Sequence, residues 1–153
     1  MNRVKENLEL LTVRNQDELP GWLTASGLTR FLHQSLEPYE DSLEEIRSAL
    51  DRVLLTELGH GGFVLLAVHE EAVQGAIVIH FTPWSGYVPE NLLLYVAVDP
   101  KHRGRGLGSY LIKQAIARCA GDIKLHVEYA NPAIKLYERL GFSSKYAEMR
   151  YSQ

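Results

Sequence analysis

A short glycine-rich segment between an apolar run and an amphipathic run constrains the fold of this chain more than any other feature. Its sequence is Arg103-Gly104-Arg105-Gly106-Leu107-Gly108-Ser109, with three glycines at alternate positions. Residues 92–98 before it form a continuous apolar run that ends at Asp99-Pro100, which is typical of a strand covered on both faces. Residues 107–119 after it place apolar side chains along one helical row, which predicts an amphipathic helix with Cys119 in the core. The chain is therefore expected to fold a central strand, a glycine loop and a helix in direct succession.

This loop has the properties of a phosphate-binding site. Glycine lets the backbone approach a ligand closely and leaves several N–H groups free to point at phosphate oxygens. The positive end of the following helix dipole adds to the attraction. Four neighbouring side chains supply further positive potential: Lys101, His102, Arg103 and Arg105. A triphosphate loop fits less well because no Lys precedes Ser109, and a dinucleotide loop fits less well because the third glycine comes one position early. A glycine turn without a ligand is the remaining alternative.

Apolar periodicity and turn residues predict the elements before the loop. In order, we expect a strand at 8–14, a helix at 18–34 with Pro20 in its first turn, a helix at 43–57, and a hairpin with strands at 63–68 and 73–81. The second helix is expected to have Asp41 or Ser42 as its N-cap and to be stopped by residues 59–62. Residues 82–89 are interpreted either as a substrate-facing segment or as an ordinary connection with two packed aromatic side chains.

After the amphipathic helix, turn residues separate three further elements. We expect a strand at 123–128, a helix that starts at Asn131-Pro132 and ends at Gly141, and a last β segment at 142–151. No repeat or Pro/Ser-rich linker divides the 153 residues, which predicts a single domain over 1–153.

The cysteine content and the charge of the chain limit which cellular compartment and which classes of ligand are expected. The chain has a single cysteine, no apolar export segment at its N-terminus and no apolar run near the roughly 20 residues that cross a bilayer, so we expect a cytoplasmic protein outside the membrane. Its formal net charge of -3 does not indicate nucleic-acid binding. Residues 1–58 carry 11 acidic and 6 basic side chains, whereas residues 59–153 carry 8 and 10. A polyanionic ligand is expected on the C-terminal part and a cationic one beside the N-terminal helices, unless these charges are only solvated helix faces.

Two motifs together resemble one known family. The pattern Val98-x-Pro100-x-x-Arg103-Gly104-x-Gly106-x-Gly108 resembles the acyl-CoA-binding motif of the GNAT N-acetyltransferase superfamily. Downstream, the run from Asn131 to Phe142 is similar to that family's second motif, at the expected distance after a helix and a strand. The resemblance implies an α+β fold, with a mostly antiparallel sheet of six to seven strands, a parallel splayed pair at the CoA cleft, and about four flanking helices.

The resemblance also implies which residues bind and react. It assigns binding of acetyl-CoA to residues of the central strand, the glycine loop and the second motif: Val96, Ala97, Val98, Arg103, Gly104, Arg105, Gly106, Leu107, Gly108, Ser109 and Asn131. It places the hydroxyl of Tyr137 near the thioester sulfur, as the acid that protonates the departing thiolate. Without the resemblance, the second motif is also explained as a capped helix start, a glycine stop and a core tyrosine.

The general base is not settled by the motifs. Many members of the family carry a glutamate in the central strand, but this chain has leucines at 92–94. The remaining candidates are Glu128, Glu90, Tyr95, His80 and His126. Strand alternation places His126 and Glu128 on one face of their predicted strand, and Glu128 is ranked first because it lies where that strand meets the cleft.

The implied function is transfer of an acetyl group from acetyl-CoA to a primary amine of a small molecule or a peptide, by direct attack in a ternary complex. Acetyl-CoA is the expected co-substrate, and no metal is expected. A cationic acceptor and a homodimer are further expectations, while nucleic-acid and membrane partners are not expected. The alternative function is a catalytically inactive acyl-CoA-binding module.

Overall fold

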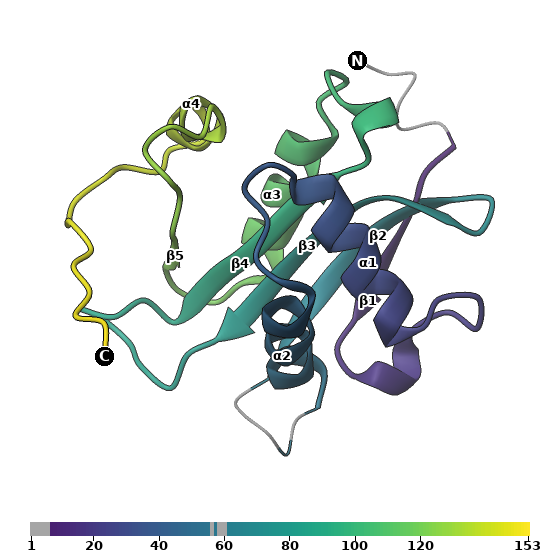
Figure 1. Ribbon diagram of the computed structural model, residues 1–153, viewed down its shortest axis with the longest axis horizontal. Coiled ribbons are helices and arrows are strands. Elements are labelled where there is room, and N and C mark those ends of the chain that lie inside the picture. Colours follow the sequence, from purple (N-terminus) through teal and green to yellow (C-terminus); the bar gives the residue numbers. More distant parts are fainter. Residues whose placement is uncertain (1–6, 56, 58–60) are drawn as a thin grey trace.

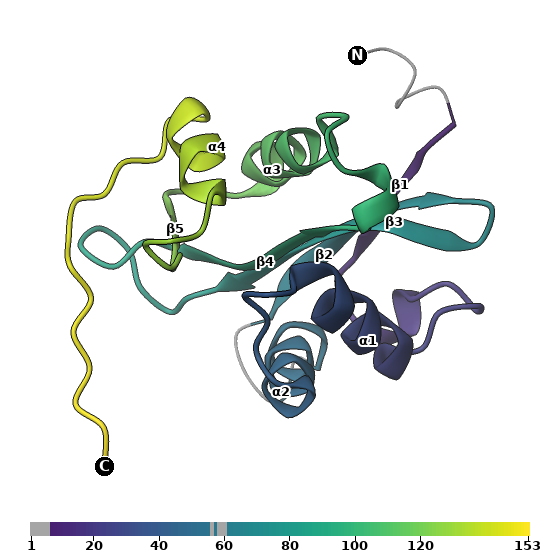
Figure 2. The same ribbon diagram turned by 45° about the horizontal axis from the view of Figure 1, so that its top comes forward.

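The computed structural model describes residues 7–55, 57 and 61–153. These residues form one five-stranded sheet in the order β1-β2-β3-β4-β5 (Figure 1). Helices α1 and α2 cover one face of the sheet, and α3 and α4 cover the other (Figure 2). The elements in chain order are β1 (Glu9–Val13), η1 (Gln16–Glu18), α1 (Ala25–Leu36), α2 (Leu43–Leu54), β2 (Gly62–His69), β3 (Ala72–Phe81), β4 (Asn91–Val98), η3 (Pro100–His102), α3 (Leu107–Arg118), β5 (Ile123–Leu125) and α4 (Ala133–Arg139).

The pairing of the strands confirms the predicted α+β class and its parallel pair. Strands β1 to β4 pair antiparallel in sequence order, and β4 pairs parallel with β5. The parallel ladder is short, because only residues 91–93 of β4 pair with β5. The described part of the chain forms five strands, slightly fewer than the expected count of about six to seven.

Alternation along the strands produces two hydrophobic layers. On β2, Val64 and Leu66 face α1 and α2, while Phe63 and Leu65 face α3. All four are fully buried. Burial of each such side chain contributes about 1.5–3 kcal/mol. The hairpin of β2 and β3 was predicted from these two apolar runs and is confirmed, with its turn at residues 70–71.

The first helix begins later than predicted. The expected helix at 18–34 is replaced by the short 3-10 helix η1 and by α1, which starts at Ala25. Its N-cap is Thr24, whose side chain accepts from the N–H of Gly27. A hydroxyl that caps a helix start is stabilising by about 1 kcal/mol, and this local signal prevails over the weaker helical pattern around Pro20.

The second helix begins as predicted and ends earlier. Ser42 caps α2 and forms a reciprocal capping box with Glu45. The helix ends at Leu54, although it was expected to reach residue 57. Part of its predicted stop, Gly59 and His60, lies outside the described residues, and β2 starts at Gly62.

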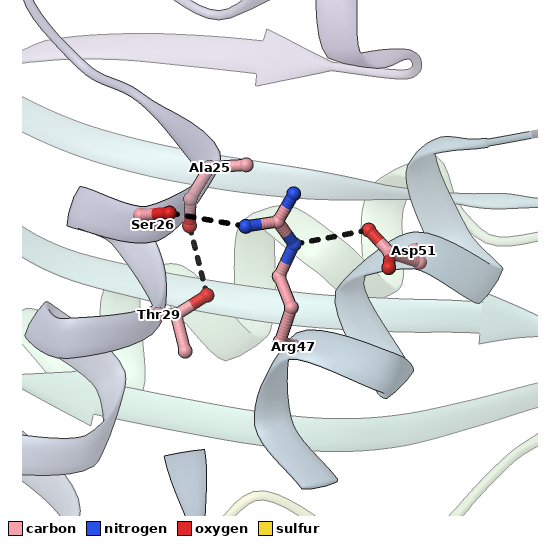
Figure 3. Close-up of polar contacts among 5 residues, drawn as sticks. All are labelled: Ala25, Ser26, Thr29, Arg47 and Asp51. Atoms are coloured by element: carbon pink, nitrogen blue, oxygen red, sulfur yellow. Dashed lines mark hydrogen bonds and ion pairs between the residues drawn. The ribbon is translucent and has the colours of Figure 1, made fainter. Parts of the chain in front are cut away.

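Polar contacts fix α2 against α1 at the outer side of the helical layer (Figure 3). The guanidinium of Arg47 donates to Asp51 Oδ1 at 3.2 Å and to Ser26 Oγ at 3.1 Å. Within α1, the hydroxyl of Thr29 donates to the carbonyl of Ala25 at 2.8 Å. Surface pairs of this kind contribute at most about 1 kcal/mol, so the buried layer beneath them determines how the helices pack.

The C-terminal part departs most from expectation. The strand predicted at 123–128 ends at Leu125, and the β segment predicted at 142–151 is extended but pairs with no strand. A strand needs a paired neighbour, and β5 is too short to offer a ladder along that length. Figure 2 shows the segment leaving α4 and running outside the sheet. Met149 and Tyr151 are accordingly almost fully exposed. Among the described helices, none has the length and apolarity that a membrane crossing requires.

Candidate functional site

The glycine loop follows the end of β4 and opens directly into α3. Asp99 caps the short helix η3 by accepting from the N–H of Lys101 at 2.9 Å. Gly104 and Gly106 then adopt φ angles of 76° and 81°, the left-handed region that favours glycine. A Cβ built on either residue meets no atom within 4 Å. The space in front of both glycines is therefore open to a ligand.

The start of α3 has free donors facing that space. Gly106 is the N-cap, and no side chain makes a capping hydrogen bond. The N–H of Tyr110 is the donor that bonds back to Gly106, at 3.0 Å. Helix geometry leaves the preceding N–H groups of the first turn without a partner inside the helix, at the positive end of the helix dipole. An exposed loop with these donors fits an anionic ligand such as a pyrophosphate.

The two arginines of the loop have different surroundings. Arg103 donates from Nη2 to the carbonyl of Ser35 at 2.6 Å and from Nε to the carbonyl of Val98 at 3.2 Å. It therefore ties the loop to the end of α1 and to the end of β4. Arg105 is exposed and has no partner among the described residues. Arg105 is the loop arginine whose charge is available to a ligand.

Beyond residue 93, β4 separates from β5. The segment 94–98 keeps its pairing with β3 but has no strand on its other side within the described chain. Leu94 has no register partner on β3, so the strand is bulged at that point. Val96 and Val98 pack toward α3, while Ala97 is buried on the opposite face. The unpaired edge of β4 leads to the glycine loop.

The second motif packs against the first. Leu136 of α4 lies near the start of α3, where a Cβ on Gly108 would be 3.8 Å from it and from Val98. At the helix start, Asn131 accepts from the N–H of Ala133 at 2.9 Å through its side-chain oxygen. The predicted helix from Asn131-Pro132 to Gly141 is thus confirmed, with a helical body at Ala133–Arg139. The fold brings the two motifs into one layer.

Tyr137 is partly buried at the junction of these elements. Its ring packs against Phe142 with centroids 5.8 Å apart, in the core layer that also contains α3. Burial raises the pKa of its hydroxyl above the ordinary 10.0. In the part of the chain that is described, the hydroxyl has no hydrogen-bond partner. It is a protonated donor at neutral pH without a protein acceptor.

Two of the candidate bases, Glu90 and Tyr95, form hydrogen bonds within the fold. Glu90 accepts from the N–H of Asp122 at 2.6 Å and from the N–H of Gly86 at 3.1 Å, and these bonds lower the pKa of its carboxyl. The hydroxyl of Tyr95 donates to Asp41 Oδ2 at 2.9 Å. Burial, together with the charge of Asp41, raises the pKa of Tyr95 well above its usual range. Neither group is disposed to accept a proton from a substrate.

The remaining candidate bases are His126, Glu128 and His80. His126 and Glu128 lie after the end of β5 and are exposed, so the strand alternation that was expected to pair them is wrong. The carbonyl of Glu128 accepts from the N–H of Asn131 at 2.9 Å and closes the turn before α4. His80 lies on β3, with its Nδ1 2.9 Å from the carbonyl of Gly61.

Sequence reasoning missed the segment between α1 and α2. The hydroxyl of Tyr39 donates to the carbonyl of Ala130 at 3.3 Å, and Asp41 receives the bond from Tyr95. Between them, Glu40 has a buried carboxylate oxygen, Oε2, without a hydrogen-bond partner among the described residues. The acidic excess of residues 1–58 was the available signal, but it does not single out these side chains.

The loop between β3 and β4 exposes its aromatic side chains. Trp84 is 62% exposed and Tyr87 is 82% exposed, so the interpretation in which both are packed is wrong. The ring of Tyr87 contacts Tyr146 of the C-terminal segment at 5.7 Å. Cys119, by contrast, is partly buried against the core layer of α3, as predicted.

Comparison of the sequence with family models shows the family of this chain. A model of the Acetyltransferase (GNAT) family matches residues 25–142, which include the glycine loop and α4. N-alpha-acetyltransferase 30 of Xenopus laevis is 39% identical over 92 residues. That stretch covers 57% of this chain and 33% of the relative, so the chain spans a minor part of that protein's length.

Solved structures share the fold. A possible acetyltransferase from Clostridium difficile 630 superposes with a TM-score of 0.69 at 22% identity, over 97% of this chain and 99% of that one. An aminoglycoside N-acetyltransferase in complex with CoA superposes with a TM-score of 0.67 at 13% identity, over 95% and 94%. Both similarities extend over nearly the whole chain.

Proposed function

The chain belongs to the acetyltransferase (GNAT) family, and on this premise we propose that it transfers an acetyl group from acetyl-CoA to a primary amine by direct attack. One observation carries the proposal. The left-handed glycines 104 and 106 leave open space in front of the uncapped start of α3, at the end of the unpaired edge of β4. The alternative is an acyl-CoA-binding module without activity, which the leucines at 92–94 favour because they place no carboxylate on β4.

The pyrophosphate of the donor is proposed to bind at the loop and at the first turn of α3. The residues concerned are Arg103, Gly104, Arg105, Gly106, Leu107, Gly108 and Ser109. Their backbone N–H groups act as donors, and Arg105 adds a positive charge. Because its guanidinium is held by two protein carbonyls, Arg103 is proposed to act through its backbone and through the position it gives to the loop.

The pantetheine arm is proposed to lie along the unpaired edge of β4. Backbone groups of Val96, Ala97 and Val98 are the proposed partners, because an extended chain can pair with a free strand edge. An N–H of this strand can also stabilise the oxyanion that forms as the thioester is attacked. The oxygen of Asn131 is occupied by Ala133 N–H, so its amide NH2 is the part left to contact the arm.

Tyr137 is the proposed acid. Departure of the thiolate is assisted when the sulfur receives a proton, and the hydroxyl of Tyr137 stays protonated because burial raises its pKa. Since donor and acceptor are held together in one site, the amine can attack the thioester directly, without a covalent intermediate on the protein.

A peptide α-amine is the proposed first acceptor to test. The relative from Xenopus laevis is named an N-alpha-acetyltransferase. An α-amine has an ordinary pKa of about 7.7–8.0, against about 10.4 for a lysine, so it loses its proton more readily near neutral pH. The carboxylates of Glu40 and Asp41, on the segment that Asp41 joins to β4, also suit a cationic group, as expected from the acidic N-terminal part.

The test is release of free thiol from acetyl-CoA in the presence of peptides, amino acids, polyamines, aminoglycosides and simple amines. We expect one acceptor class to release thiol well above the hydrolysis measured without an acceptor. Binding of acetyl-CoA without release by any class would favour the inactive module. Absence of binding would contradict both functions.

Replacement of Arg103 is expected to lower the stability of the fold, whereas replacement of Arg105 is expected to lower the affinity for acetyl-CoA. In Arg103→Ala, the free energy of unfolding should fall by about 1.5–3 kcal/mol, because charge-assisted bonds to Ser35 and Val98 are lost. In Arg105→Ala, stability should change little, whereas the Kd of acetyl-CoA should rise about 10-fold. Urea denaturation and calorimetric titration measure the two effects. The reverse pattern would contradict the assignment of Arg105 as the free cation.

Cys119 is expected to be dispensable. Burial raises the pKa of its thiol to about 11, so at pH 8 only about 0.1% is thiolate. Alkylation by iodoacetamide should be about 100-fold slower than for a free cysteine, and Cys119→Ala should keep its kcat. Mass spectrometry after mixing with acetyl-CoA checks the same point, since an acetyl group found on Cys119 would contradict direct attack.

A further inference from the structure

The segment between α1 and α2 is anchored to β4 and to the turn between β5 and α4. On one side, the hydroxyl of Tyr39 donates to the carbonyl of Ala130, which follows β5. On the other side, Asp41 accepts from the hydroxyl of Tyr95 on β4. Figure 1 shows this segment passing in front of β4. The segment therefore connects β4, beyond the end of its ladder with β5, to the turn that precedes α4.

Glu40 lies between these two anchors. Its Oε2 is buried, and no described residue donates a hydrogen bond to it. A buried carboxylate oxygen without a donor is costly, because the water that it loses is not replaced. The neighbouring acids differ, since Asp41 has the Tyr95 hydroxyl and Glu45 has the N–H of Ser42. The buried oxygen of Glu40 can therefore still accept a hydrogen bond, and it belongs to the segment that joins β4 to the turn before α4.

We propose that Glu40 binds the ammonium group of the acceptor and accepts its proton before attack. This inference rests on the proposed acetyl transfer. Sequence reasoning assigned the role of general base first to Glu128. The present inference assigns that role to Glu40. Glu128 is exposed and lies on a turn after β5, whereas Glu40 has a buried oxygen and lies between Tyr39 and Asp41, which are tied to the turn before α4 and to β4. A desolvated carboxylate attracts a cation more strongly than a solvated one does.

The step balances in protons and electrons. One ammonium proton passes to the carboxylate of Glu40, and the nitrogen lone pair that is freed attacks the thioester carbonyl carbon. The carbon–sulfur bond breaks as Tyr137 gives its proton to the sulfur, and a second proton from the nitrogen restores the tyrosine. Glu40 releases its proton to water. The products are an amide, CoA thiol and one proton.

The expected acceptor is a primary amine that carries a positive charge when it binds. A carboxylate in this position favours a primary amine that arrives as a cation and disfavours alcohols, thiols and amines next to an acidic group. A peptide with a free α-amino group, followed by uncharged side chains, fits this requirement. A peptide with an acetylated N-terminus does not fit it and serves as the blank.

The test compares three conservative substitutions with a free-α-amine peptide as acceptor and saturating acetyl-CoA. The variants are Glu40→Gln, Glu128→Gln and Glu37→Gln, the last as a control that removes an exposed charge from the same segment. At pH 7 we expect kcat/KM for the peptide to fall about 100-fold in Glu40→Gln only. Its acetyl-CoA affinity and thermal stability should match those of the wild type.

The pH profile distinguishes a proton acceptor from a structural role. With glutamine at position 40, only amine that is already neutral reacts, so the rate should rise with pH up to about 8 more steeply than in the wild type. Glu40→Asp should recover part of the rate. A wild-type rate and profile in Glu40→Gln, or a loss confined to Glu128→Gln, would overturn the inference while leaving acetyl transfer intact. If the wild type binds acetyl-CoA but acetylates no amine, the proposed function fails, and the role of Glu40 fails with it.

Discussion

Valine at position 106 is expected to weaken acetyl-CoA binding by about 100-fold. Gly106 has a φ of 81° and is the N-cap of α3, so its missing side chain leaves the open space in front of the helix start. A valine there places methyl groups where phosphate oxygens are proposed to bind, and it also disfavours the left-handed backbone. Calorimetric titration with acetyl-CoA measures the loss directly.

A second glycine provides the matched control. Gly86 has a φ of 77° and no atom within 4 Å of a built Cβ, but it lies in the loop before β4, at the other end of that strand. Gly86→Val carries a similar backbone cost and should leave the Kd of acetyl-CoA unchanged. Gly108→Ala should also be mild, since its Cβ makes only ordinary contacts with Leu136 and Val98. Equal affinity in Gly106→Val and the wild type would remove the loop as the pyrophosphate site.

Removal of the hydroxyl of Tyr137 is expected to lower kcat about 100-fold without a change in acetyl-CoA affinity. Phenylalanine keeps the ring contact with Phe142, so the fold of α4 should persist. Burial raises the tyrosine pKa above 10.0, which means that the acid form is fully present from pH 6 to 9 and is lost only at higher pH. Tyr137→Phe should therefore be slow over that whole range.

The measurement is turnover at saturating acetyl-CoA, with Tyr151→Phe as a control that removes an exposed hydroxyl. The control should behave as the wild type. If Tyr137→Phe keeps the wild-type rate between pH 6 and 9, Tyr137 is not the acid, and the sulfur must leave without a proton from this residue.

Local signals in the sequence predicted the parts of the fold that depend on local chemistry. Ser42 caps α2 as predicted, and the glycine loop falls between β4 and α3. Helix α4 begins next to Asn131-Pro132. Such features follow from the conformations that a few adjacent residues prefer, so they can be read without knowledge of the tertiary structure.

Features that depend on distant partners were predicted less well. Residues 126–128 could extend β5 only by pairing with β4, and the ladder between these strands ends at Leu93 and Leu125. Residues 142–151 pair with no strand of the described chain. The general base was hard to predict for the same reason, because its position depends on contacts between residues that are distant in the sequence. Glu128 was ranked first because its predicted strand was expected to meet the cleft there, which requires a strand longer than β5. Glu40 is indicated only by its buried oxygen and by the contacts of its neighbours Tyr39 and Asp41 with distant residues.

The central claim is tested most directly by following an isotopically labelled acetyl group from acetyl-CoA to a peptide with a free α-amine. The account predicts one labelled acetyl group on the amine for each CoA thiol released, with much slower transfer by Tyr137→Phe than by the wild type. Acetyl-CoA that binds at the loop but delivers no label to any amine in the acceptor screen would contradict it.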